Sequence, residues 1–143
     1  MGTIINKFGK MTGWNSLTVN MMGRDVEGIT AVKYDDTLTK ENVYGAGKYP
    51  VGRGEGKYEA KATLTILKEE MDALQSALVP GKRIQDIAPF DVIAQYEMVD
   101  GKIVTDRIRN CEFMGRGVEV KQGDGSIAMA YELIVSHIDW NTI

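Results

Sequence analysis

The sequence predicts a mainly β protein, an antiparallel β-sandwich or barrel with one flanking α-helix and a long glycine-rich loop. Three observations lead to this prediction. Apolar and polar residues alternate with a period of two in several segments, as in strands with one buried face. Residues 68–79 instead space their apolar side chains at helical intervals. Glycines crowd into residues 37–56, where the apolar periodicity fades.

The N-terminal part of the chain is expected to hold an arm, residues 1–14, followed by two strands. Residues 14–22 alternate between apolar and polar side chains, and Gly23 then opens a turn. Alternation resumes over residues 26–34. We therefore expect these two segments to pair as a hairpin.

The centre of the chain holds the clearest strand and the predicted helix. Residues 57–66 show the cleanest period of two in the sequence. In residues 68–79, Glu69 and Glu70 lie in the first turn, where the positive end of a helix dipole favours acidic side chains. Pro80 cannot continue a helix and is expected to end it.

The C-terminal half is predicted to consist of strands joined by short turns. Asp100-Gly101 is a typical hairpin turn, and Gly123-Asp124-Gly125 separates a second pair of segments. The predicted strands cover residues 90–98, 103–109, 111–121 and 127–138.

Composition limits the possible classes of protein. The 143 residues fit one domain, so a single domain over residues 1–143 is expected. Hydrophobic residues make up 43% and charged residues 26%, which is typical of a globular protein. A net charge of −3 disfavours tight binding of nucleic acid. No apolar stretch is long enough to span a bilayer, so we expect a soluble protein without a membrane anchor.

The sequence offers few residues for catalysis or metal binding. His137 is the only histidine and Cys111 the only cysteine, so no zinc site, disulfide or ordinary catalytic triad can be assembled. We expect His137 to be a packed or rim residue and Cys111 a small core residue. The glycine motifs lack the spacing of nucleotide-binding loops, since Pro50 replaces a required glycine. The prediction is no enzyme, no cofactor and no metal.

The predicted long loop and the N-terminal arm share an unusual mixture of residues. Both combine glycines with apolar and basic side chains, a mixture suited to docking on another subunit. In the loop, the alternative is a flexible hairpin tip. In the N-terminal arm, the alternative is that the apolar side chains cover the core of their own subunit. The residues concerned include Val43, Tyr44, Tyr49, Val51, Lys48 and Arg53 in the loop, and Ile4, Ile5, Phe8, Met11, Trp14, Lys7 and Lys10 in the arm.

Residues 43–56, followed by a charged alternating strand and one helix, are similar to the long-loop region of phage tail tube proteins. The chain length and the strand-rich C-terminal half also resemble that family. The resemblance implies a β-sandwich or barrel with a flanking helix, in which residues 37–56 form an inter-subunit loop. It further implies hexameric rings that stack into a tube, on the same plan as the tube of type VI secretion.

The same resemblance implies particular contacts and partners. Sheath, baseplate and tape-measure proteins would surround the tube, DNA would pass through its lumen without specific binding, and the particle would be a virion tail assembled in the bacterial cytoplasm. Residue by residue, it places Phe8 and Trp14 at ring junctions. The subunit-contacting loop would contain Tyr44, Gly45, Gly47, Tyr49, Pro50, Gly52, Arg53 and Gly56.

Two other functions are compatible with the sequence. A small-ligand or carbohydrate-binding β-barrel could use aromatic side chains as stacking surfaces, with Tyr49, Tyr58, Tyr96 and Trp140 as the candidates. An enzyme would have to use Cys111 as its nucleophile.

Overall fold

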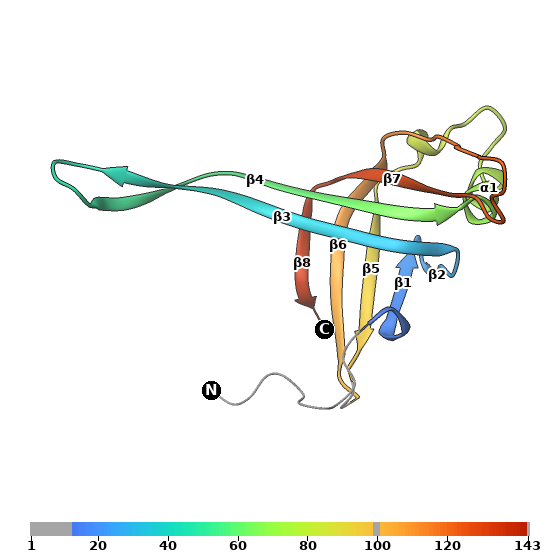
Figure 1. Cartoon of the computed structure of the whole chain (residues 1–143), viewed down its shortest axis with the longest axis horizontal. Coiled ribbons are helices and arrows are strands. Elements are labelled where there is room, and N and C mark those ends of the chain that lie inside the picture. The colour runs from blue at the N-terminus through green and yellow to red at the C-terminus, as the bar shows by residue number, and fades with distance from the viewer. Residues whose placement is uncertain (1–12, 99–100, 143) are drawn as a thin grey trace.

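The computed structural model describes residues 13–98 and 101–142 (Figure 1). Their strands form one antiparallel sheet in the order β2-β1-β5-β6-β7-β4-β3, and β8 pairs with β6 beside this path. The predicted mainly β, antiparallel architecture with one helix is confirmed, in the form of an open sheet. The strands are β1 (Leu17–Met21), β2 (Arg24–Asp25), β3 (Ile29–Tyr44), β4 (Pro50–Leu67), β5 (Phe90–Glu97), β6 (Ile103–Phe113), β7 (Ala128–Val135) and β8 (His137–Thr142).

Strand β6 joins two halves of the sheet. Most of its length pairs with β5 and β8, whereas its last two residues, Glu112 and Phe113, pair with β7. Figure 1 shows β3, β4 and β7 crossing β5, β6 and β8 at a steep angle. The two halves therefore face each other across a common core.

The core is filled by the alternating apolar residues of both halves. In β4 the buried side chains are Ala62, Leu64 and Ile66, which confirms the predicted buried face over residues 62–66, whereas Tyr58 of the same predicted face is exposed. The other buried apolar side chains of the strands include Val19, Met21, Val92, Ala94, Ile108, Cys111, Phe113, Tyr131, Leu133 and Val135. Because the buried residues of β1, β5, β7 and the inner half of β4 fall at every second position, the period of two seen in the sequence has a direct physical cause.

Helix α1 (Lys68–Ser76) follows β4 directly and matches the predicted segment 68–79 except at its C-terminal end. Met71 and Leu74 are buried against the core. Arg116 anchors the segment between β6 and β7 to this helix, because its guanidinium donates to Gln75 Oε1 at 2.8 Å and to Asp72 Oδ1 at 3.0 Å. Among the described residues, no helix is long and apolar enough to cross a membrane.

One predicted pairing is wrong, and a second is shorter than predicted. The segments 14–22 and 26–34 do not pair with each other, because β1 pairs with β5 and β3 pairs with β4. The turn at Gly23 supports only the two-residue strand β2. The segment 114–127 is not a strand, so the predicted strand 111–121 ends at Phe113, and its pairing with β7 is limited to Glu112 and Phe113.

The predicted long loop over residues 37–56 is also wrong as a description of the backbone. Strands β3 and β4 run through this segment, and only residues 45–49 connect them. Cross-strand pairs continue as far as Tyr44 and Pro50. The reason is that backbone hydrogen bonds form a ladder without needing a buried face.

Candidate functional site: a projecting hairpin arm

The outer parts of β3 and β4 form a hairpin, residues 37–59, that projects well beyond the rest of the molecule (Figure 1). We call this hairpin the arm, as distinct from the N-terminal segment 1–14. Its strands pair from Thr37 with Glu59 to Tyr44 with Pro50. Register shifts near both ends of this stretch mark bulges, which increase local twist. The arm therefore has regular backbone structure but no core of its own.

Apolar side chains concentrate near the tip of the arm and are open to water. Tyr49 is 73% exposed and Val51 70%, and Val43 and Tyr44 are also exposed. Leaving several large apolar groups in water is unfavourable by roughly 25 cal/mol per Å² of apolar surface. An exposed apolar cluster on a projecting element is typical of a binding surface.

One face of the arm carries little side-chain material on β4. Gly54 and Gly56 lie beside Glu41 and Thr39 of β3, because a Cβ atom at these glycines would meet those side chains first. Such a bare strip lets another backbone approach closely. Among the glycines of the arm, only Gly47, in the connecting turn, has a backbone conformation that favours glycine, with φ of +115°.

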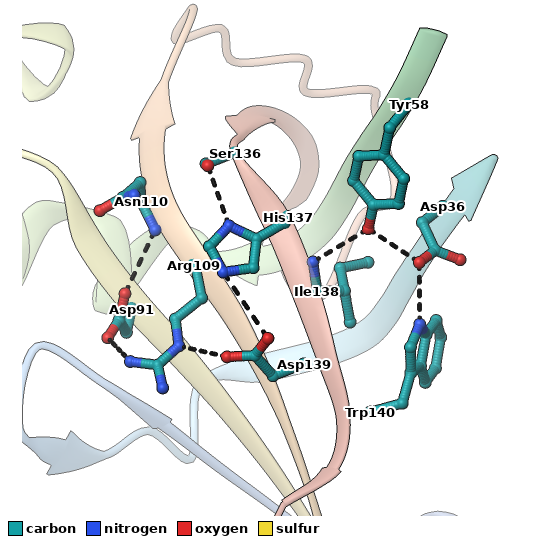
Figure 2. A network of polar contacts seen from close by, with 10 residues as sticks. All are labelled: Asp36, Tyr58, Asp91, Arg109, Asn110, Ser136, His137, Ile138, Asp139 and Trp140. Carbon is teal, nitrogen blue, oxygen red and sulfur yellow. Dashed lines mark hydrogen bonds and ion pairs between the residues drawn. The ribbon is translucent and has the colours of Figure 1, made fainter. Parts of the chain in front are cut away.

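The root of the arm is fastened to β8 by a shared carboxylate (Figure 2). Asp36 Oδ2 accepts hydrogen bonds from the Tyr58 hydroxyl at 2.8 Å and from the Trp140 indole nitrogen at 2.9 Å. The Tyr58 hydroxyl in turn accepts the backbone N–H of Ile138 at 3.2 Å. We call this group of four residues the root clamp, since it joins β3, β4 and β8.

A second polar group lies beneath the root clamp. The Tyr34 hydroxyl donates to the buried Asp106 carboxylate at 2.5 Å and contacts the Tyr96 hydroxyl at 2.7 Å. Burial and the hydrogen bond to Asp106 raise the pKa of Tyr34 far above its usual value, so it stays protonated. The Tyr34 ring also packs against Trp140, with centroids 5.4 Å apart. Together these contacts fix the end of β3 from which the arm projects.

A groove lies at the opposite end of the molecule, beside β1 and β2. Its volume is about 390 Å³, and its lining combines apolar residues with two acidic ones, Asp25 and Glu27. The lining residues are Trp14, Leu17, Thr18, Val19, Asp25, Val26, Glu27 and Ile29.

The structure places the predicted interface residues in two separate regions. Trp14 lies at the groove and is 53% exposed, whereas Phe8 lies outside the described residues. The remaining predicted residues are all on the arm, in its strands or its turn: Tyr44, Gly45, Gly47, Tyr49, Pro50, Gly52, Arg53 and Gly56. Their role in subunit contacts stays a prediction.

Cys111 is unsuited to nucleophilic chemistry. Its side chain is fully buried in the core, and burial raises the pKa of the thiol to about 12. A thiol at this pKa holds almost no thiolate near neutral pH. The expected role of Cys111 as a small core residue is confirmed.

His137 lies at the surface, within a chain of polar contacts (Figure 2). Its Nδ1 is 3.0 Å from Ser136 Oγ, and its Nε2 is 3.6 Å from Asp139 Oδ1. Arg109 occupies the other oxygen of Asp139 at 2.8 Å and also binds Asp91 at 3.0 Å. These contacts tie β5, β6 and β8 together, and the His137 side chain is 47% exposed. The expected rim position of His137 is confirmed.

The Arg109 contact predicts a pH effect on stability. The hydrogen bond from Arg109 holds the pKa of Asp139 below its usual value. The contact therefore contributes to the free energy of unfolding at pH values above the unfolded pKa of about 3.9. This contribution is lost as pH falls through the lower folded pKa. Chemical unfolding as a function of pH should show the stabilities of wild type and Asp139→Asn converging as the pH falls below the unfolded pKa and through the lower folded pKa of Asp139. A constant difference between them down to pH 2 would contradict this.

The aromatic residues proposed for ligand stacking do not face a common pocket. Tyr49 lies at the tip of the arm, whereas the Tyr96 hydroxyl is hydrogen-bonded to that of Tyr34, away from the arm. Tyr58 and Trp140 do come together, but their polar atoms are used by Asp36. Within the described part of the chain, no group of three or more His, Cys, Asp or Glu side chains could hold a metal ion.

Sequence reasoning missed the root clamp and the groove. Nothing in the local sequence links Asp36 to Trp140, more than a hundred positions away. The strand nature of the arm did leave a signal, because Gly52, Gly54 and Gly56 alternate strictly with charged residues.

Comparison with solved structures shows which proteins share this fold. A chain of the anti-feeding prophage (AFP) tube terminating cap superposes with a TM-score of 0.69 at 11% identity, covering 97% of this chain and 96% of that chain. A chain of the PVC sheath-tube complex, an extracellular contractile injection system in its extended state, superposes with a TM-score of 0.66 at 10% identity. The match covers 92% of this chain and 91% of that chain. A chain of the anti-feeding prophage baseplate superposes with a TM-score of 0.54 at 8% identity, covering 86% of this chain and 89% of that chain.

These similarities extend over nearly the whole fold, and at such low identities they concern the fold alone. No protein-family model matches the sequence, and no curated protein matches it.

Proposed function

We propose that this chain is a structural, non-enzymatic subunit of a phage-tail-like contractile injection particle, and that its copies form stacked hexameric rings that make up the tube. The observation that carries the proposal is the arm, which exposes Tyr49 and Val51 at 73% and 70% in the single subunit. A neighbouring subunit would remove these groups from water.

The sheet itself supports assembly. Strand β3 is the edge at one end of the sheet, and β1 and β2 form the other end. Unpaired strand edges readily pair with another chain, and rings of subunits satisfy them. Structures with the same fold include a tube cap and a sheath-tube complex, which supports a place in the tube.

The proposal also names the surroundings of the tube. Sheath and baseplate proteins would contact its outside and end, as the occurrence of this fold in a sheath-tube complex and a baseplate suggests. A tape-measure protein would set its length, and DNA would pass through its lumen during ejection. The net charge of −3 gives the chain no excess of basic groups to hold nucleic acid.

Negative-stain electron microscopy of the purified protein tests the proposal. We expect rings or tubes of uniform diameter at high protein concentration, or on co-expression with a cognate sheath protein. A stable monomer under both conditions would refute a tube role.

A further inference from the structure

The groove beside β1 and β2 has the character of a receptor for an apolar, basic segment. Leu17, Val26 and Ile29 provide an apolar lining of a cavity of about 390 Å³. Asp25 and Glu27 add negative charge at exposed positions of the same lining. The neighbouring Arg24 does not neutralise them, because it is ion-paired with Glu70 of α1.

The tip of the arm has the complementary character. Residues 42–54 contain Lys48 and Arg53 and no acidic residue. Tyr49 and Val51 supply exposed apolar side chains between these two cations. The Lys48 ammonium lies 5.7 Å from the centre of the Tyr49 ring, so charge and aromatic surface are presented together.

The arm tip and the groove lie at opposite ends of the subunit. In Figure 1 the tip of the β3–β4 hairpin is at the far left, whereas β1 and β2 lie on the right. The tip therefore cannot reach the groove of its own chain. Two different, complementary surfaces at opposite ends produce head-to-tail contacts, which close into rings or extend as filaments.

We propose that the arm tip of one copy docks in the Trp14 groove of the next, with Tyr49 and Val51 against the apolar lining and Lys48 and Arg53 beside Asp25 and Glu27. This inference rests on the proposed function and adds to it the receiving surface. Trp14, at the rim of the groove, would cover the docked tip. Charge complementarity would fix the direction in which successive copies add.

A charge-swap experiment in the full-length chain tests this docking. The arm variant carries Lys48→Glu and Arg53→Glu, and the groove variant carries Asp25→Lys and Glu27→Lys. Each variant alone should raise the concentration needed for assembly about tenfold or more in low salt, because like charges then meet. Combining all four changes should restore assembly to within about threefold of wild type, since the coupling is pairwise.

A matched variant identifies a competing occupant. The N-terminal segment also combines basic and apolar residues, so Lys7→Glu with Lys10→Glu is tested in the same way. One outcome is that the groove changes restore assembly when combined with the N-terminal changes but fail to restore it when combined with the arm changes. In that case the N-terminal segment occupies the groove, and the proposal is overturned. Absence of any rescue, while wild type still assembles, overturns it too. Failure of wild type to assemble would instead count against the tube itself.

Discussion

A subunit whose arm has been cut back should fold normally and fail to assemble. The variant replaces residues 43–52 by Asn-Gly, which joins Asn42 to Arg53, two residues that already face each other across the hairpin. Asn-Gly favours the tight turn that connects antiparallel strands. Because the removed residues are exposed and contribute nothing to the core, thermal unfolding should shift by only a few degrees.

The expected loss of assembly is complete, because the exposed cluster at the tip is removed as a whole. Sedimentation and negative-stain microscopy would measure it, with circular dichroism reporting the fold. A full-length control with Tyr44, Tyr49 and Val51 changed to Thr keeps the arm length and removes its apolar contacts. If the shortened chain still formed tubes, the arm would have no role in assembly. If it unfolded, the arm would be part of the folded core.

Core truncation in the same hairpin should have the opposite effect, with a large loss of stability. Leu64 of β4 is completely buried between Val32 and Tyr131, its partners on the two neighbouring strands. Leu64→Ala should reduce the free energy of unfolding by about 2–5 kcal/mol, through lost burial and the cavity left behind. Denaturant unfolding followed by circular dichroism measures the change.

The matched control lies further along the hairpin. Leu38 of β3 is 39% exposed and faces Tyr58 on the arm. Leu38→Ala should cost less than about 1 kcal/mol, because little apolar surface is lost from the interior. Equal losses at Leu38 and Leu64 would mean that arm and body form one packed unit.

Local sequence patterns predicted the elements whose one face is buried. Residues 57–66 and 90–98 alternate because Leu64, Ile66, Val92 and Ala94 point into the core. The helix was found for the same reason, since Met71 and Leu74 are spaced for one buried face. Pairing partners were less predictable. The chain near Gly23 has the form of a hairpin turn, yet β1 joins β5, about seventy residues away.

The arm escaped prediction as a strand pair because neither of its faces is buried. An alternation of apolar and polar residues appears where burial selects every second residue, and residues 39–56 are almost entirely exposed. The alternation of Gly52, Gly54 and Gly56 with charged residues is of a different kind and does not mark a buried face. Its glycines favour the prediction of a loop, although only Gly47 among them has a positive φ. The resemblance to tail tube proteins did single out this segment.

The root clamp could not be predicted, since it joins residues that only the completed topology brings together. Asp36, Tyr58 and Trp140 come from three strands and are all partly solvent-accessible, so no burial pattern marks them. The same holds for the groove, whose lining spans β1, β2 and the start of β3.

The root clamp also bears on the order of folding. Its contacts link residues 80 positions apart, between Tyr58 and Ile138, and 104 apart, between Asp36 and Trp140. Closing such long loops carries a large entropic cost, so contacts of this kind form late. The β3–β4 hairpin is local and can form early, but its direction would be set only when β8 is in place. Formation of the root clamp would thus fix the direction of an arm whose own hairpin is already paired.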